Sequence, residues 1–251
     1  SLGVSEQITC KCLRNYAQLE ECVVATKFVN AMSDAPNMRG LSRKHIQQEC
    51  EASLKRLGVD AIDLYYVHRF DRQTPIEETL AALDLLVQQG KVRHLGASST
   101  AAWRFMKALG ISDRRGWSQF AVMQNHYNLI YREEEREMMP LCADEGVAVV
   151  PWSPLARGAL ARGALPDESE ATARSESDDF ARRLYSHASD NEVLSALKNV
   201  ASRRGEHPAQ VALAWLLSKP RVTAPIIGAT KMEHLDTAIA ALDVRLRDDW
   251  A

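Results

Sequence analysis

The stretch AIDLYYVHRFD, residues 61–71, carries a run of apolar and aromatic residues directly into a histidine. A short run that is apolar at nearly every position is typical of a strand buried on both faces of a parallel sheet. The run ends at His68, whose side chain changes charge near neutral pH. The stretch therefore predicts a buried strand that delivers a titratable ring to its carboxyl end.

Five further runs have the same character, and helical patterns separate them. The six predicted strands cover residues 22–27, 62–68, 92–98, 120–125, 148–153 and 224–230. Between the first three runs, apolar residues recur at helical spacing from Ser42 to Gly58 and from Thr74 to Gly90, each with a capping residue at the start and a glycine at the end. Strands and helices that alternate in this way form βα units on a parallel sheet.

One motif decides between two parallel architectures. An open, doubly wound sheet that binds a nucleotide should carry G-x-G-x-x-G in its first strand-to-helix turn, and none of these turns carries it. The pattern therefore favours an α/β protein with a (β/α)8 TIM barrel, in a single domain over residues 1–251. Only six of the eight strands are recognisable and the chain opens on a helical pattern, so we expect the barrel to be N-terminally incomplete. We expect residues 162–190 to form a long polar loop after the fifth visible strand.

Composition narrows the class of partner. The 251 residues are 46% hydrophobic and 25% charged with a formal net charge of -2, which gives no electrostatic reason to expect nucleic acid or a membrane surface. The five cysteines are odd in number and lack the paired spacing of a metal site, so we expect no metal and a reducing compartment. No apolar run approaches 18 residues. The sequence predicts a cytoplasmic protein with a small-molecule partner.

Polar residues close all six predicted strands. In a barrel, residues at the carboxyl ends of the strands build the active site. The residues at these six ends are Lys27, His68, Ser98, Gln124, Ser153 and Thr230. A lysine can lower the pKa of a neighbouring acid, and a histidine can hydrogen-bond a substrate carbonyl. Each also has a plain alternative, because Lys27 can be a surface lysine and His68 a hydrogen-bonded histidine in a loop. Six polar ends together favour a site at one rim.

Six motifs, taken in order, resemble the aldo-keto reductases over essentially the whole chain. They are TK at 26–27, DLYYVHRFD at 63–71, GKVRHLGASS at 90–99, MQNHYN at 123–128, PWSPLARG at 151–158 and IIGATK at 226–231. Two more, GLSRKHI at 40–46 and NLIYREEERE at 128–137, are most similar to bacterial and fungal oxidoreductases related to the potassium-channel β-subunits. The resemblance implies a (β/α)8 barrel that binds NADPH and reduces an aldehyde or ketone to an alcohol.

The resemblance also implies a role for each matching residue. Lys27 matches the lysine that lowers the pKa of a catalytic tyrosine, and His68 matches the histidine that orients the carbonyl. The cofactor-binding positions are Ser98, Ser99 and Gln124 for the carboxamide, Trp152 for the nicotinamide ring, Ser153, Pro154, Leu155, Arg157 and Gly158 for the pyrophosphate, and Gly228, Thr230, Lys231 and His234 for the adenosine phosphate. The positions for the adenosine phosphate favour NADP over NAD as the cofactor.

Three of these assignments carry a departure or an alternative. Ser99 stands where many members of the family have asparagine. Trp152 replaces the usual stacking aromatic and can instead be an ordinary core side chain. Lys231 can be a solvated lysine at a helix start, although a helix N-terminus with a lysine beside it suits a phosphate.

The general acid is the largest departure from the family's pattern. The family's tyrosine and its aspartate partner precede a segment like GVSEQI, which begins here at Gly3, so both residues are expected ahead of Ser1. The chain is then either part of a longer protein or an inactive truncated relative. Two other functions stay open: a non-catalytic NADP(H)-binding, redox-sensing module, and a Schiff-base aldolase that acts through Lys27.

Overall fold

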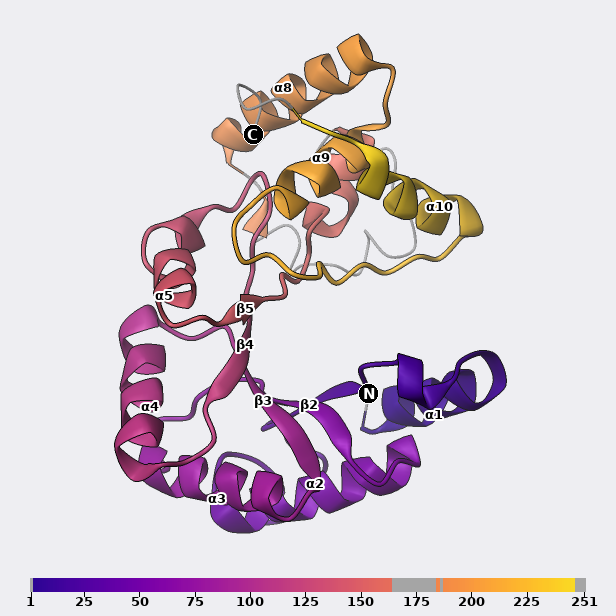
Figure 1. The fold of residues 1–251 in the computed structure, drawn as a ribbon. Helices are drawn as coiled ribbons and strands as arrows, with labels where there is room; N and C mark the ends of the chain where they lie inside the picture. The colour runs from indigo at the N-terminus through magenta and orange to yellow at the C-terminus, as the bar shows by residue number, and fades with distance from the viewer. Residues whose placement is uncertain (1, 164–183, 186, 247–251) are drawn as a thin grey trace. The chain divides into compact units, whose positions relative to one another are not determined.

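The computed structural model describes residues 2–163, 184–185 and 187–246. They belong to two compact units, Ser1–Gln124 and Asn125–Ala251 (Figure 1). Most of the polar loop predicted for residues 162–190 lies outside the described residues. Its last residues begin a helix, because α8 starts at Ala188.

The first unit opens on a helix and then alternates parallel strands with helices. Its elements are α1 (Val4–Tyr16), the 3-10 helix η1 (Leu19–Glu21), β1 (Ala25–Phe28), α2 (Arg43–Leu57), β2 (Ile62–Val67), α3 (Ile76–Gln88), β3 (Val92–Ser98), α4 (Ala102–Arg115) and β4 (Phe120–Gln124). The strands lie in the order β1-β2-β3-β4, and each neighbouring pair is parallel. The first four predicted strands are confirmed, with small shifts at their ends.

Local signals set the ends of helix α2. The Ser42 hydroxyl accepts a hydrogen bond from the backbone N–H of His45 at 3.3 Å, which satisfies one of the free donors of the first turn. The helix stops at Gly58, which takes a left-handed conformation with φ of 67°. Glycine adopts this conformation without the steric cost of a Cβ atom, so the chain can turn there into β2.

The sheet of the first unit has two unlike faces, because side chains alternate along each strand. One face is buried beneath α2, α3 and α4 (Figure 1), and the Phe120 ring lies 5.7 Å from the Phe105 ring of α4. Its buried side chains are Phe28, Tyr65, Val67, Leu95, Ala97, Phe120 and Met123. The opposite face is mixed: Lys27 pairs in register with Tyr66, and Ser98 with Gln124. The polar strand ends therefore share the face opposite the helices.

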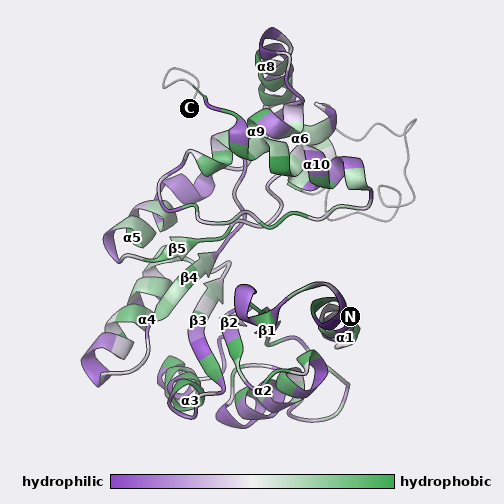
Figure 2. Ribbon diagram, turned by 45° about the vertical axis from the view of Figure 1, so that its right-hand side comes forward, coloured by the Kyte–Doolittle hydropathy of each residue, from purple (hydrophilic) through white to green (hydrophobic). Residues whose placement is uncertain are grey.

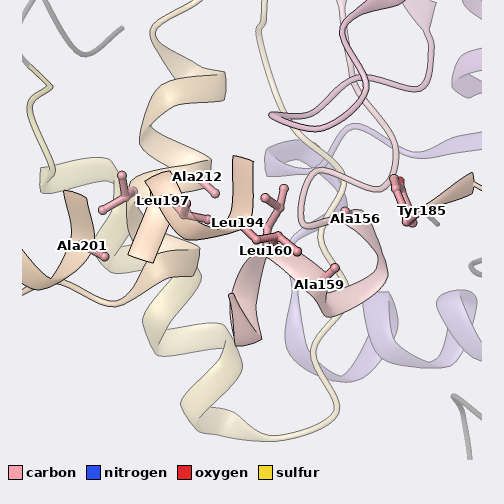
Figure 3. Close-up of a cluster of buried hydrophobic side chains, with 9 residues drawn as sticks. Ala156, Ala159, Leu160, Tyr185, Leu194, Leu197, Ala201 and Ala212 are labelled. Carbon is pink, nitrogen blue, oxygen red and sulfur yellow. The ribbon is translucent and has the colours of Figure 1, made fainter. Parts of the chain in front are cut away.

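The second unit is mainly helical. Its elements are η2 (Glu133–Glu135), α5 (Met138–Asp144), β5 (Ala148–Val149), η3 (Ala156–Gly158), α6 (Ala159–Arg162), α8 (Ala188–Arg204), α9 (Pro208–Leu217), α10 (Met232–Ala240) and η5 (Ala241–Asp243). Helix α9 is apolar along most of its length (Figure 2), and every residue from Val211 to Leu216 is buried. It packs with α6 and α8 around a cluster that includes Leu160, Leu194 and Leu197 (Figure 3).

Two strand predictions in this unit need correction. The strand predicted for residues 148–153 is reduced to β5, and the strand predicted for residues 224–230 is wrong. A single parallel bridge joins Val149 to Val222, and the Ile226 N–H donates to the Pro151 carbonyl at 2.9 Å. Pro225 has no N–H to donate to a ladder, and no strand forms over residues 224–230.

Within the described ranges, none of the helices has both the length and the apolar character needed to span a membrane.

Candidate functional site

Lys27 and His68 lie at the carboxyl ends of neighbouring strands. Lys27 is in register with Tyr66 across β1 and β2, and the backbone N–H of His68, the residue after β2, donates to the Phe28 carbonyl at 3.3 Å. Parallel strands bring their carboxyl ends to the same edge of a sheet. The positive charge of Lys27 also acts on the His68 ring and contributes to lowering its pKa.

The ammonium group of Lys27 contacts an amide and an aromatic ring. Its Nζ donates to the Oε1 atom of Gln124 at 2.9 Å and lies 5.5 Å from the centre of the Tyr66 ring. Although much of the Lys27 side chain is exposed, these neighbours replace water around the charged end, and desolvation lowers the pKa of Lys27. Burial raises the pKa of Tyr66 to about 12, while a hydrogen bond with Gln124 acts in the opposite direction.

Gly96 makes room for Tyr66. The two residues are paired across β2 and β3, and a Cβ atom at position 96 would overlap the Tyr66 ring carbons. The ring therefore lies against the backbone of the neighbouring strand, beneath the Lys27 ammonium. The motif match does not single out Tyr66, although its position two residues before His68 puts it on the same face of the strand.

His68 is half-buried and has an amide neighbour. The Asn30 Nδ2 atom lies 3.1 Å from its Nδ1 atom. Desolvation, followed by the charges of Lys27 and Arg69, lowers the pKa of His68 and so favours the neutral ring. Asn30 was also missed, because its hydrogen bond joins residues that are 38 positions apart in the chain.

The three residues expected to hold a carboxamide lie together at the ends of β3 and β4. Ser98 and Gln124 are in register and buried, the Ser98 and Ser99 hydroxyls are 3.3 Å apart, and the Ser99 N–H donates to the Gln124 carbonyl at 3.1 Å. Arg69 donates to the Ser99 carbonyl at 3.0 Å. Ser99 has φ of 45°, a left-handed conformation that asparagine adopts more readily than serine.

In the second unit, Trp152 belongs to a stack of three rings. The His126 ring lies 4.3 Å from the Trp152 ring and 4.2 Å from the Tyr131 ring, with interplanar angles of 12° and 16°. The His126 Nε2 atom is 2.5 Å from the Tyr185 hydroxyl, and burial lowers the pKa of His126 to about 4. Asn128 donates to the Tyr185 hydroxyl at 3.1 Å and to the Ser153 carbonyl at 2.9 Å. The plane of Trp152 is thus fixed by an uncharged imidazole.

The loop after β5 holds the residues expected to bind a pyrophosphate. Ser153 and Arg157 have φ of 53° and 54°, and Gly158 has φ of 101°, so the loop is tightly coiled. Strained backbone of this kind is frequent at ligand sites. Pro154 is buried, and Leu155 packs against the cluster drawn in Figure 3, which anchors the loop to α6, α8 and α9.

The last four predicted residues surround the start of α10, and all four are exposed. Lys231 lies 3.3 Å from Glu233, and the Thr230 hydroxyl is 3.5 Å from His234 Nδ1. Because the segments carrying Val149 and Val222 run parallel, this loop and the Ser153 loop follow from the same end of adjacent segments. The helix N-terminus favours an anion, whereas Glu233 opposes one.

The part of the chain that the structure describes holds no group of three or more His, Cys, Asp or Glu side chains arranged for a metal ion.

Comparison with known proteins identifies the family. The model of the aldo/keto reductase family matches residues 2–250. The chain is 41% identical to versiconal hemiacetal acetate reductase of Aspergillus parasiticus over 267 residues, which cover 98% of this chain and 76% of the relative. It is 39% identical to an aldo-keto reductase of Fusarium vanettenii, with 99% of this chain and 73% of the relative covered. It is 37% identical to the aldo-keto reductase dtxS3 of Metarhizium robertsii, with 99% of this chain and 73% of the relative covered.

Proposed function

The chain belongs to the aldo/keto reductase family, a family of (β/α)8 barrels, and on that premise we propose that it uses NADPH to reduce a small aldehyde or ketone to an alcohol. The observation that carries the proposal is the rim of the first unit. There the ammonium of Lys27 and the imidazole of His68 lie at the ends of adjacent parallel strands, with Ser98, Ser99 and Gln124 beside them.

The residues of the second unit fit a dinucleotide by their chemistry. The half-buried indole of Trp152, held by the His126 stack, offers an apolar surface for the nicotinamide ring. The coiled main chain from Ser153 to Gly158 and the exposed cation of Arg157 suit a pyrophosphate, and Lys231 at the start of α10 suits a further phosphate. These features support NADP as the cofactor, with Lys231 as the residue that would favour it over NAD.

NADPH, when bound, supplies the hydride that the carbonyl carbon accepts. The protein supplies position and polarity. His68 is placed to hydrogen-bond the carbonyl oxygen as negative charge develops there. Lys27 favours the ionised form of a nearby acid by its charge, and we assign the proton donor to a tyrosine expected ahead of Ser1. Gln124 and the serines hold the carboxamide that fixes the cofactor beside this rim.

The proposal is tested by the oxidation of NADPH with 4-nitrobenzaldehyde, followed by absorbance, with the intact protein as it occurs in the cell. We expect turnover with NADPH and weaker turnover with NADH. The substitution Lys231→Glu should raise KM for NADPH about 10-fold through the loss of one charge-assisted contact and should leave KM for NADH nearly unchanged. Lys107→Glu, on the exposed surface of α4, is the matched control.

Each competing function gives a different result in the same experiments. Tight NADPH binding without oxidation across a panel of aldehydes and ketones would indicate a redox-sensing module rather than a reductase. Covalent attachment of a carbonyl compound to Lys27 after borohydride treatment would indicate Schiff-base chemistry.

A further inference from the structure

The hydrogen bond between Asn30 and His68 determines where the histidine carries its proton. The Asn30 side-chain nitrogen lies 3.1 Å from His68 Nδ1. An amide nitrogen has two N–H groups to donate and does not accept hydrogen bonds. The His68 Nδ1 atom must therefore be the acceptor, and it accepts only when it carries no proton.

A ring whose Nδ1 accepts a hydrogen bond is not doubly protonated, so it carries a single proton. Lys27 of β1 and Arg69 of the loop after β2 both act on His68, and both are cations that oppose a second proton. Burial acts in the same direction and is the largest cause of the lowered pKa. With Nδ1 occupied as an acceptor, the single proton of the neutral ring is on Nε2.

We propose that Asn30 is a positioning residue, which holds His68 in the tautomer with its proton on Nε2 so that this N–H can donate to the oxygen of a carbonyl substrate. The inference rests on the proposed function, in which a carbonyl group is reduced at this rim. In the other tautomer Nε2 would present a lone pair to the substrate oxygen, and the interaction would be repulsive.

The loop after β1 is folded back so that Asn30 faces the end of β2. Val29, immediately before Asn30, has φ of 115°, which is strained backbone for a β-branched residue. The conformation is held by the Gly40 N–H, which donates to the Val29 carbonyl at 2.9 Å. Such strain persists only where surrounding contacts enforce it, and here it directs the Asn30 side chain to His68.

The loop that follows His68 is tied to the same segment. The Asp71 carboxylate accepts from the backbone N–H of Leu41 at 2.9 Å and from that of Thr74 at 2.7 Å. Leu41 is adjacent to Gly40, so hydrogen bonds fix both loops to one short stretch of chain. The approach of Asn30 to His68 is therefore set by several backbone contacts and not by their mutual hydrogen bond alone.

The direct test is 15N NMR of the histidine rings in the full chain, with the His68 signals assigned by their loss in His68→Gln. We expect the neutral ring of His68 to carry its proton on Nε2 in the natural sequence. In Asn30→Asp the carboxylate accepts from Nδ1–H, so the proton should move to Nδ1 and the pKa of His68 should rise. Asn15→Ala, an exposed asparagine in α1, should change nothing.

A proton on Nδ1 in the natural sequence, or an unchanged tautomer in Asn30→Asp, would overturn the proposal. In the activity assay, Asn30→Ala and Asn30→Asp should lower kcat/KM for the carbonyl substrate by about 10- to 100-fold, with KM for NADPH unchanged. Circular dichroism of each variant checks that it is folded. The NMR result does not depend on turnover, so an inactive protein with the expected tautomer would count against the reductase function and not against the role of Asn30.

Discussion

The Lys27 ammonium donates a hydrogen bond of 2.9 Å to the side-chain oxygen of Gln124. Lys27 is expected to act on the proton donor, and Gln124 is expected to hold the cofactor carboxamide. The hydrogen bond therefore joins a residue of the proposed proton transfer to a residue of the proposed cofactor site. Gln124 is buried and uncharged, and it therefore fixes Lys27 without neutralising it. The charge of Lys27 stays available to stabilise an anionic group at the rim.

The first prediction concerns that charge. Lys27→Met keeps most of the apolar stem of the side chain but removes the ammonium group, and it should lower kcat for carbonyl reduction by about 100- to 10,000-fold, the range for loss of assistance to a general acid. Steady-state kinetics with 4-nitrobenzaldehyde measure the effect. Lys107→Met, on the exposed face of α4, should retain full activity. Retention of kcat within twofold in Lys27→Met would remove Lys27 from the mechanism.

The second prediction concerns the fit of Tyr66 against Gly96. In Gly96→Ala the new methyl group overlaps the Tyr66 ring, so the free energy of unfolding should fall by about 1–3 kcal/mol. Urea denaturation measures the change. Gly110→Ala, inside α4, meets only the end of the Arg114 side chain and should be neutral or stabilising. In a Tyr66→Leu background the same glycine substitution should cost much less, and an equal cost of Gly96→Ala in both backgrounds would contradict this account.

The third prediction concerns the pH dependence of stability in the second unit. His126 has a pKa of about 4 in the folded protein and an ordinary value of 6.5, so between these values the unfolded chain binds a proton that the folded protein excludes. The free energy of unfolding should therefore fall by about 3 kcal/mol as the pH drops from 6.5 to 4 and should change little through this group below pH 4.

Chemical denaturation at a series of pH values measures this slope. In His126→Gln the titratable ring is absent and the slope between pH 6.5 and 4 should become smaller. His234→Gln, which removes an exposed histidine of the same unit, should leave the slope unchanged. A slope that is the same in all three proteins would assign the pH dependence to other groups.

The fourth prediction concerns Arg69. Its charge contributes to the lowered pKa of His68, so Arg69→Gln should raise that pKa and protonate the ring at a higher pH than in the natural sequence. NMR titration of His68 follows the change directly. Arg72→Gln, an exposed arginine in the same loop, is the control. If Arg69→Gln leaves the titration unchanged, desolvation and Lys27 account for the pKa of His68 by themselves.

The strands of the first unit could be predicted from sequence because their pattern is simple. β2 and β3 are covered on one face by helices, and apolar residues predominate along both strands, so each strand is recognisable as a short apolar run between two helical patterns. Their polar ends then follow from the rule for parallel strands. The same reasoning placed Lys27, His68, Ser98 and Gln124 at one edge.

The remaining features of the fold and site could not be predicted, because composition and local sequence pattern do not determine tertiary contacts. Residues 224–230 are as apolar as a strand, but Pro225 breaks the ladder and the Ile226 and Ile227 side chains are exposed. The stack of Trp152 on His126 joins residues from two separate motifs, and the Asn30 contact depends on the unusual backbone of Val29. Such contacts arise from tertiary packing, which local propensity cannot anticipate.

The close approach of Tyr66 to Gly96 limits which amino-acid substitutions this rim can accept during evolution. Any larger residue at position 96 would be acceptable only after the aromatic ring at position 66 had been lost, and with that ring would go the platform beneath the Lys27 ammonium. Descendants of this sequence should therefore keep or lose the tyrosine and the glycine as an inherited pair.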